Sequence, residues 1–324
     1  MIEREGFQAQ AQYLPDFSNP AHRTQGGTRL KISILTPSYG YGRFMSDCVE
    51  SVLRQEGVAV EHIVMDGGSK DETVEILQSL SSDPRLRWVS EPDDGQSDAL
   101  NKAFAMATGD WIGWLNADEF YLPNALARVA DCVLANPAAD LIYGEYAEVD
   151  VDGRLGRLVT SHGFSGQAFQ SICFVASCTT FIRRDAIPAR PWDTQCPSMM
   201  DWDLFLGMYR ADKNFTHLKH PLAAFRIHAD QVTASAVAAS PEEFARIRDR
   251  HGIPRGASAY RAVAAVGRGV HISKKLAEGA YLREIRASRL KGRSLKWFDQ
   301  VDTEALRSLG AAYAQKPGRG EPGR

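Results

Sequence analysis

Short apolar segments alternate with helical patterns between Lys31 and Gly144. The segments KISILT, VEHIVMD, LRWVS, DWIGWLN and DLIYG predict strands. Between them, apolar residues recur every three or four positions, which predicts helices. Four exchanges of strand and helix at short spacing require right-handed crossovers, and therefore a mainly parallel sheet covered on both faces.

Local signals predict further boundaries. Residues 69–72 (SKDE) fit a capping box that starts a helix, and Pro123 suits the first turn of another helix. Asp152 and Gly153 predict a hairpin turn. Later strands are expected in CTTFIRRDAI and FTHLKHPLAAFRIH, with a helix over residues 201–210.

Composition narrows the class of protein. The 324 residues are 44% apolar, enough for one large domain or a domain with an appendage, and the formal net charge of −2 argues against a dedicated nucleic-acid binder. No apolar run approaches the ~20 residues of a membrane-spanning helix, and the N-terminus shows no signal-peptide core. Five scattered cysteines without a C-x-x-C pair predict reduced thiols and a cytoplasmic protein.

Polar loops follow the first four predicted strands. The carboxyl ends of parallel strands share one edge of the sheet, where ligands of such sheets bind. Asp66 ends a strand and precedes two glycines, which permit close approach of a ligand, so its carboxylate can accept from a ribose hydroxyl or a base N–H. A helix cap explains Asp66 equally well, and it is the better explanation for Asp71.

The segment NADE, residues 116–119, is the sharpest element of this edge. Oxygen ligands at a strand end can coordinate Mg²⁺ or Mn²⁺, which would bridge the phosphates of a nucleotide. By itself the segment is more typical of an Asx turn, and the metal interpretation gains weight from the other polar loops. His228 follows a predicted strand and can point into the same site, although a lone histidine is more often structural.

Signatures of several other enzyme classes are missing from the sequence. No Gly-x-Gly-x-x-Gly follows a strand, no Gly-Lys-Ser/Thr P-loop occurs, and no Gly-x-Ser-x-Gly elbow appears. These observations disfavour dinucleotide oxidoreductases, P-loop enzymes and α/β hydrolases.

Six segments, read together, resemble the family 2 nucleotide-sugar glycosyltransferases. They are ISILTPSYG, EHIVMDGGSKDETVEIL, EPDDGQSDALNKAF, GDWIGWLNADEFYLPNAL, MDWDLFL and FRIHADQVT, in order over residues 31–235. The resemblance implies an α/β fold of GT-A type, with a mainly parallel Rossmann-like sheet and helices on both faces, here followed by a helical C-terminal extension. It also implies inverting transfer of a sugar from a nucleoside diphosphate, with UDP expected, to an acceptor hydroxyl in polysaccharide or glycoconjugate biosynthesis.

The resemblance also implies roles for particular residues. Asp201 matches the acidic motif that supplies the catalytic base, and a helix N-cap is compatible with that role. Asp118 stands at the main contact to Mn²⁺ or Mg²⁺, and His228 at a position that completes the metal site in some members. The expected nucleotide-binding residues are Thr36, Pro37, Tyr39, Asp66, Gly67, Ser69, Gln96, Ser97, Asp98, Asn101, Asn116 and Ala117.

Four positions depart from the family pattern. Asn116 replaces the first Asp of Asp-x-Asp, and Met200 stands where the family often has Glu. Leu100 and Ala103 replace a basic residue and a glycine. These departures bear on metal affinity and nucleotide identity more than on the reaction class.

The expected organisation follows from the resemblance and from composition. Residues 1–28 are a flexible lead-in, 29–238 the GT-A domain (29–120 for the nucleotide, 121–238 for the acceptor), 239–315 a basic helical extension and 316–324 a disordered tail. Residues 268–296 carry nine Arg or Lys and two Glu. This segment can lie on an anionic membrane surface, although a solvated helical face or a dimer contact is slightly favoured.

The expected partners are a nucleotide-sugar donor and a sugar or lipid-linked glycan acceptor, without nucleic acid; contact with the inner face of a membrane and a homo-oligomer are further options. Two other functions compete with glycosyl transfer. A nucleotidyltransferase can share the strand-edge acids and the metal, but it would normally carry a Gly-rich basic loop where this chain has TPSYGYGRF. A non-catalytic sugar-nucleotide-binding relative is the other, and retention of Asp118 and Asp201 argues against it.

Overall fold

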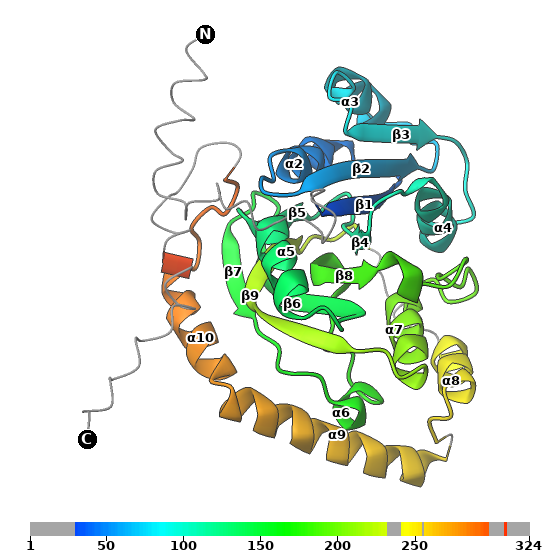
Figure 1. Cartoon of the computed structure of the whole chain (residues 1–324), viewed down its shortest axis with the longest axis vertical. Coiled ribbons are helices and arrows are strands. Elements are labelled where there is room, and N and C mark those ends of the chain that lie inside the picture. Colours follow the sequence, from blue (N-terminus) through cyan, green and yellow to red (C-terminus); the bar gives the residue numbers. More distant parts are fainter. Residues whose placement is uncertain (1–29, 232–240, 255, 298–307, 310–324) are drawn as a thin grey trace.

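We describe a computed structural model of the chain, which defines residues 30–231, 241–254, 256–297 and 308–309. The predicted lead-in over 1–28 and the predicted disordered tail over 316–324 lie outside the described residues. The described strands form one nine-stranded sheet in the order β3-β2-β1-β4-β8-β6-β9-β5, with β7 beside β6 (Figure 1).

The first half of the sheet is parallel, as the alternating pattern predicts. Its strands are β1 (Lys31–Ser38), β2 (Ala59–Asp66), β3 (Leu86–Ser90) and β4 (Trp111–Trp114). Its helices are α2 (Gly42–Leu53), α3 (Thr73–Leu80) and α4 (Gln96–Met106).

The second half of the sheet is mixed, because β8 runs antiparallel to both β4 and β6. Its strands are β5 (Phe120–Tyr121), β6 (Leu141–Val149), β7 (Leu155–Val159), β8 (Thr180–Arg183) and β9 (Phe215–Arg226). The hairpin predicted at Asp152 and Gly153 joins β6 to β7, and Gly153 has the positive φ of 76° that its turn requires.

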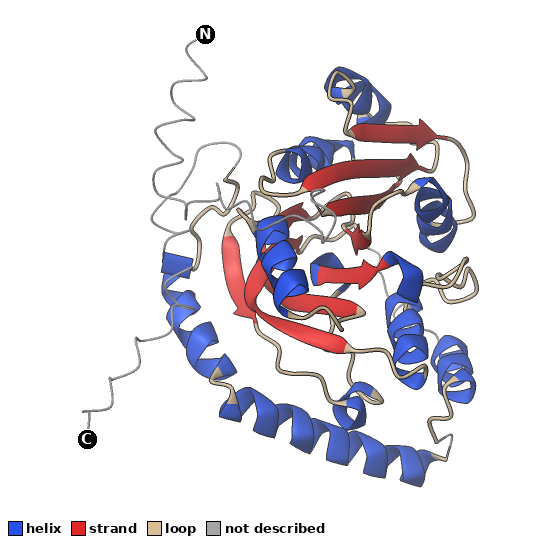
Figure 2. Ribbon diagram, in the orientation of Figure 1, coloured by secondary structure: helices blue, strands red, loops and turns tan. Residues whose placement is uncertain are grey.

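Helices surround the sheet and form one border of the molecule (Figures 1 and 2). They are α5 (Ala125–Ala135), α6 (Gly166–Phe169), α7 (Met200–Arg210), α8 (Pro241–Arg250), α9 (Ala257–Ala277) and α10 (Ala280–Ala287). Among the described residues, no helix has both the length and the apolar character that a membrane crossing demands.

Burial on both faces explains why the central strands read as continuous apolar runs. Leu35 of β1 packs with Leu100 of α4 on one face of the sheet. Ile34, the preceding residue, belongs to a second buried cluster on the other face, which also contains Leu126 of α5. The alternation of side chains along a strand therefore fills two separate core layers.

Two predicted helix starts are wrong in detail. Helix α3 begins at Thr73 without a side-chain cap from Glu72, so residues 69–72 do not form a capping box. Ser69 instead accepts from the Gly40 N–H at 2.8 Å and bonds to Asp66. Pro123 precedes the first residue of α5 by two positions, so it lies outside that helix.

Candidate active site

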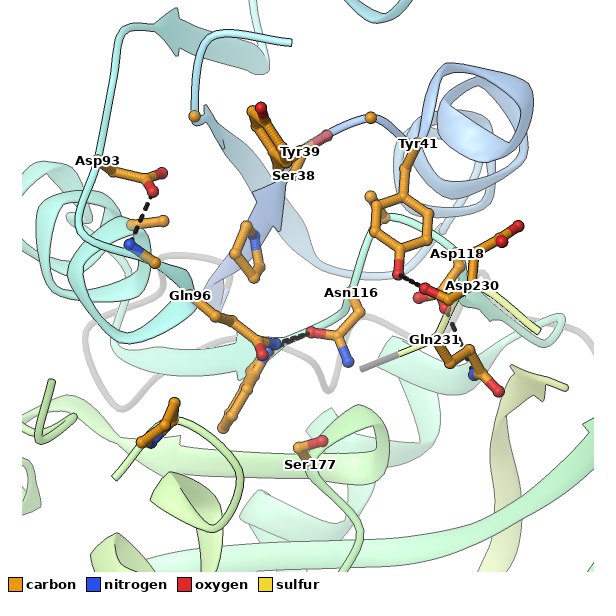
Figure 3. Close-up of a pocket in the computed structure, with 18 of the residues that line it drawn as sticks. Ser38, Tyr39, Tyr41, Asp93, Gln96, Asn116, Asp118, Ser177, Asp230 and Gln231 are labelled. Atoms are coloured by element: carbon orange, nitrogen blue, oxygen red, sulfur yellow. Dashed lines mark hydrogen bonds between the residues drawn. The ribbon is translucent and has the colours of Figure 1, made fainter. Parts of the chain in front are cut away.

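A cavity of about 1220 Å³ opens at the carboxyl edge of β1, β2 and β4. Figure 3 shows side chains from the strand-end loops surrounding it, with Ser177 on the side away from β1. Six carboxylates and one arginine line it: Asp71, Glu72, Asp93, Asp118, Asp201, Asp230 and Arg43. The cavity is therefore acidic, which suits a hydrated cation or neutral sugars and disfavours a bare phosphate without a cation.

Many of the predicted nucleotide-binding residues line this cavity. They are Pro37, Tyr39, Gly67, Gln96, Asn116 and Ala117. Tyr39 is 66% exposed, and its ring offers a face on which a base or sugar can stack. Asp93 follows β3 at the same edge and also lines the cavity, although it was not among the predicted nucleotide-binding residues. A Cβ at Gly67 would lie 2.9 Å from the Asp93 carboxylate, so the two residues are close neighbours. Burial raises the pKa of Asp93.

Asp66 and Ser69 lie behind the cavity wall. Asp66 is 1% exposed and accepts from the Gly68 and Ser69 N–H groups and from the Ser90 hydroxyl. These bonds fold the loop after β2, so the contact of Asp66 with the cavity is indirect.

Four other predicted nucleotide-binding residues are bonded to neighbouring protein groups. The Thr36 hydroxyl lies 2.8 Å from His62 Nε2 inside the sheet. Asp98 pairs with Lys102 at 3.1 Å on the surface of α4. Ser97 donates to the Met200 sulfur, and Asn101 donates to the Trp192 carbonyl at 2.7 Å.

Asp118 is held from three sides at the opposite end of the cavity. Its Oδ2 lies 3.0 Å from His228 Nε2 and 3.4 Å from the Gln231 amide nitrogen. The buried Arg226 donates to the Asp118 carbonyl at 2.9 Å and also pairs with Asp47 of α2. The carboxylate is thus fixed in place by residues that follow β9.

His228 contacts Arg43 as well as Asp118. Its Nδ1 lies 3.2 Å from Arg43 Nη2, so in this arrangement Nδ1 accepts and the Nε2–H donates to Asp118. Coordination of a metal by Nε2 requires the other tautomer, and Arg43 would then have to leave Nδ1. The same Arg43 Nη2 also pairs with Asp230, 2.8 Å away, and this pairing can hold Arg43 when it leaves Nδ1.

The segment after β4 is ordered by its own side chains. The Asn116 amide oxygen accepts hydrogen bonds from Gln96 Nε2 at 2.7 Å and from Trp114 Nε1 at 2.8 Å. These bonds fix the orientation of three side chains that line the cavity. The fully buried Glu119 accepts from the Asn116 N–H at 2.7 Å. Burial and the neighbouring Asp118 raise the pKa of Glu119 well above its usual value.

Asp201 enters the cavity from α7, in the half of the chain that follows β4. Its Oδ1 accepts from the Trp202 N–H at 2.7 Å. Burial raises the pKa of this carboxyl to about 6. A carboxylate with such a pKa is ionised at neutral pH and is still basic enough to take a proton.

A second acidic cluster lies beside α7. Single ligand atoms of Asp193, Cys196 and Asp203 lie within 4.8 Å of one another. Arg250 already bonds both carboxylates, and His251 Nε2 lies 2.7 Å from Asp203. We therefore interpret this cluster as an ion-pair network that ties α8 to α7.

Asp118 and its surroundings fit a divalent cation better. Mg²⁺ and Mn²⁺ in nucleotide sites use one or two carboxylates, with the remaining positions taken by phosphates and water. Asp118 lines the cavity, and Asp230 supplies a second carboxylate at the same end, as Figure 3 shows. His228 Nε2 and Asp118 Oδ2 are 3.0 Å apart, a separation that two ligands of one cation can have.

The mixed sheet and the acidic cavity at its carboxyl edge define an enzyme of the GT-A fold. Residues 33–189 match the model of Glycosyl transferase family 2. This chain therefore carries a family 2 glycosyltransferase domain.

Curated relatives carry the same kind of name. An uncharacterised glycosyltransferase of Nostoc sp. is 27% identical over 236 residues, which cover 67% of this chain and 71% of the relative. A chondroitin synthase of Pasteurella multocida is 26% identical over 62% of this chain. That match covers 21% of the synthase, so this chain corresponds to about a fifth of its length.

Solved structures share the fold at low identity. TarS residues 1–349 of S. aureus, in complex with UDP-GlcNAc, superpose with a TM-score of 0.53 at 15% identity, over 87% of this chain and 79% of that one. The mannosyltransferase PcManGT of Pyrobaculum calidifontis, with GDP-Man and Mn²⁺, gives a TM-score of 0.50 at 16% identity, over 94% and 92%. Both matches show the GT-A fold.

Several residues that line the cavity were not predicted from the sequence. Tyr41 and Arg43 come from the start of α2, and Asp230 and Gln231 follow β9. The Tyr41 hydroxyl donates to the Asp230 carbonyl at 3.2 Å, which joins these two segments over the cavity. No periodic pattern connects positions 189 residues apart, so this contact had no signal in the sequence.

Proposed function

We propose that this enzyme transfers a sugar from a nucleoside diphosphate, with UDP the expected nucleotide, to an acceptor hydroxyl with inversion at the anomeric carbon. The observation that carries the proposal is Asp201, a carboxyl with a raised pKa that lines the same cavity as Asp118 but comes from a different half of the chain.

In this proposal the nucleoside lies against the loops after β1, β2 and β3. Tyr39 stacks on the base or ribose, and Asp93 accepts its hydrogen bonds. Gly67 leaves the room that Asp93 needs. Asp66 holds the loop after β2 in place, so its effect on the nucleoside is indirect.

The diphosphate lies at the other end of the cavity. Asp118 would hold Mn²⁺ or Mg²⁺ there. His228 would be a further ligand once Arg43 leaves its Nδ1 and keeps only the pairing with Asp230. The cation, when bound, supplies positive charge beside the diphosphate. The Mn²⁺ in the complex of the mannosyltransferase supports this choice of cation.

Asp201 acts as the general base in this proposal. The acceptor oxygen forms a bond to the anomeric carbon while the bond from that carbon to the diphosphate oxygen breaks. The acceptor proton passes to Asp201, and the nucleoside diphosphate leaves with the bonding electrons. Displacement in one step gives inversion because the two oxygens are on opposite faces of the sugar.

The acceptor is proposed to be a glycan or another hydroxyl-bearing molecule of polysaccharide or glycoconjugate synthesis. The match to part of a chondroitin synthase supports a saccharide acceptor. The described cysteines are free thiols and four of the five are buried, which supports a cytoplasmic site of reaction.

A screen of UDP-, GDP- and TDP-sugars by thermal shift, with Mn²⁺ and with EDTA, tests this proposal. We expect one nucleotide to raise the unfolding midpoint in Mn²⁺ and to lose that effect in EDTA. Incubation of that donor with acceptor glycans should release the nucleoside diphosphate. Release of pyrophosphate would instead indicate a nucleotidyltransferase, and binding without any release would indicate a non-catalytic relative.

A further inference from the structure

Helix α9 has an unusual surface. Its apolar residues Ala262, Ala265, Val266, Gly269, Ile272 and Leu276 are all exposed. They recur at steps of three and four and therefore form one stripe along the helix. A surface helix normally turns such a stripe toward the core, whereas this one turns it to solvent.

The opposite side of α9 is the one that packs on the domain. Ala264, Gly267 and Lys275 are buried. A Cβ at Gly267 would lie 3.0 Å from the Gln167 carbonyl, which shows how closely α9 approaches α6. Small residues thus allow α9 to approach the domain closely, and no described residue covers its apolar stripe.

Helix α10 continues this surface. Leu282 and Ile285 are 60% and 63% exposed, beside 63% for Leu276 and 48% for Ile272 at the end of α9. Five of the nine large apolar side chains that are exposed in the described chain lie on these two helices. Figure 1 shows α9 and α10 as one continuous outer border of the molecule.

Within residues 257–297, every exposed charged residue is basic. The exposed basic residues are Arg261, Arg268, Arg286, Arg289 and Lys291. The two acids of residues 257–297 are bonded to groups of the fold instead. Glu278 accepts from the Gly163 N–H at 2.8 Å, and Glu284 pairs with Lys275 at 2.6 Å.

We propose that the outer faces of α9 and α10 bind the surface of an anionic lipid bilayer. Val266, Ile272, Leu276, Leu282 and Ile285 enter the boundary between headgroups and acyl chains. The arginines that flank them contact the lipid phosphates. An apolar stripe bordered by basic residues is the pattern of helices that lie in this interface.

Charge distinguishes this partner from a second copy of the chain. A two-fold contact of α9 and α10 would bring two identical faces together, and the exposed charged residues of these two helices are all arginines. An anionic bilayer satisfies both the apolar and the basic residues of the face. The proposal does not depend on the identity of the sugar that the enzyme transfers.

Sedimentation of the full chain with lipid vesicles tests the proposal. We expect binding to vesicles of phosphatidylcholine mixed with phosphatidylglycerol, and little binding to phosphatidylcholine alone. Leu276→Gln with Leu282→Gln should lower partitioning on the order of tenfold. Arg268→Gln with Arg286→Gln should lower vesicle partitioning about fivefold for each charge removed. This decrease should be smaller at high salt, because salt screens the attraction to the lipid phosphates.

Matched controls use the same substitutions elsewhere on the surface. Leu134→Gln on α5 and Arg54→Gln just after α2 replace exposed residues on other elements, and they should leave vesicle binding unchanged. All variants should unfold at the temperature of the wild type, because the replaced side chains are exposed. Equal binding by the variants and the wild type would overturn the proposal. So would a wild-type dimer that the leucine variant dissociates while vesicles bind neither protein.

Discussion

At the scale of single residues, two acids of one helix illustrate how position decides chemistry. Asp201 and Asp203 are two residues apart on α7, so they point in different directions. Asp201 lines the cavity, whereas Asp203 is 6% exposed and bonded to Arg250 and His251. The sequence suggested Asp201 through the family motif, and the partners of Asp203 add an independent reason for that choice.

Asp203→Asn should therefore reduce stability more than catalysis. The variant keeps the size of the side chain but loses the charge that faces Arg250 and His251. We expect the free energy of unfolding to fall by about 1–3 kcal/mol, with turnover at permissive temperature close to that of the wild type. Urea unfolding and initial rates check this. Wild-type stability with greatly reduced turnover would contradict it.

Asp118→Ala should remove the effect of metal on donor binding. The nucleoside diphosphate should bind the wild type more tightly in Mn²⁺ than in EDTA, and the variant equally in both. His228→Ala should reduce the difference less, because it removes a neighbour of Asp118 and leaves the carboxylate in place. Calorimetric titrations with and without EDTA measure both effects. A full response to Mn²⁺ in Asp118→Ala would exclude this carboxylate as the metal site.

The limits of sequence reasoning are also visible at this scale. An acid at a strand end can be located from the pattern, but its rotamer and partners cannot. Asp66 therefore fitted a nucleoside contact and a helix cap equally well, whereas its bonds to Gly68, Ser69 and Ser90, which fold the loop after β2, have no counterpart in local sequence. Thr36 is similar, since its bond to His62 depends on the pairing of β1 with β2.

At the scale of elements, predictions succeeded where burial imposes a period. Strands β1 and β2 are buried along nearly their whole length, which leaves a continuous apolar run that is easy to recognise. Strand β5 has two residues and no period to detect, and it exists because it pairs with β9. The start of α3 was misplaced because Ser69 bonds to Gly40 and Asp66, which a capping-box pattern cannot register.

The loop after β2 offers a test of this element-level account. Gly67→Ala adds a Cβ that would lie 2.9 Å from the Asp93 carboxylate, so this carboxylate must move. We expect severalfold weaker donor binding and an almost unchanged unfolding temperature. Gly256→Ala, where no atom lies within 4 Å of the new Cβ, is the control. Unchanged donor affinity in Gly67→Ala would separate Asp93 from the donor site.

At the scale of the whole molecule, the C-terminal helices are attached to the domain by buried polar groups. Arg283 of α10 pairs with the fully buried Glu145 of β6 at 2.6 Å. His162 Nε2 and His271 Nδ1 of α9 lie 2.9 Å apart. Composition predicted a basic helical extension, but these pairs join residues more than 100 positions apart, so the sequence did not predict where it docks.

This interface should make stability depend on pH. Burial lowers the pKa of His217 to about 3 and of His271 to about 4, below the usual value near 6.5. Lys275 lowers and Glu284 raises the pKa of His271 to a smaller extent. Between pH 6.5 and 4 the unfolded chain binds more protons than the folded one, so stability falls as pH falls.

For His217, whose side chain is 5% exposed, the loss between pH 7 and pH 5 should be about 1–2 kcal/mol. Urea unfolding at both pH values measures it for the wild type and for His217→Gln. The variant should lose less stability on acidification than the wild type. Equal losses would show that His217 does not contribute to the acid sensitivity.

The central claim is that Asp201 removes the proton of the acceptor, and the most direct test compares Asp201→Asn with the wild type in turnover and donor affinity. Loss of a general base typically lowers the rate by about 10²–10⁴. Donor Kd should change little, since the proposed partner of this carboxyl is the acceptor and not the nucleotide. The wild-type rate should fall as pH drops below about 6, where the pKa of Asp201 lies. The residual rate of the variant should not show this fall. A variant with wild-type turnover, or one that has lost donor binding, would contradict the assignment.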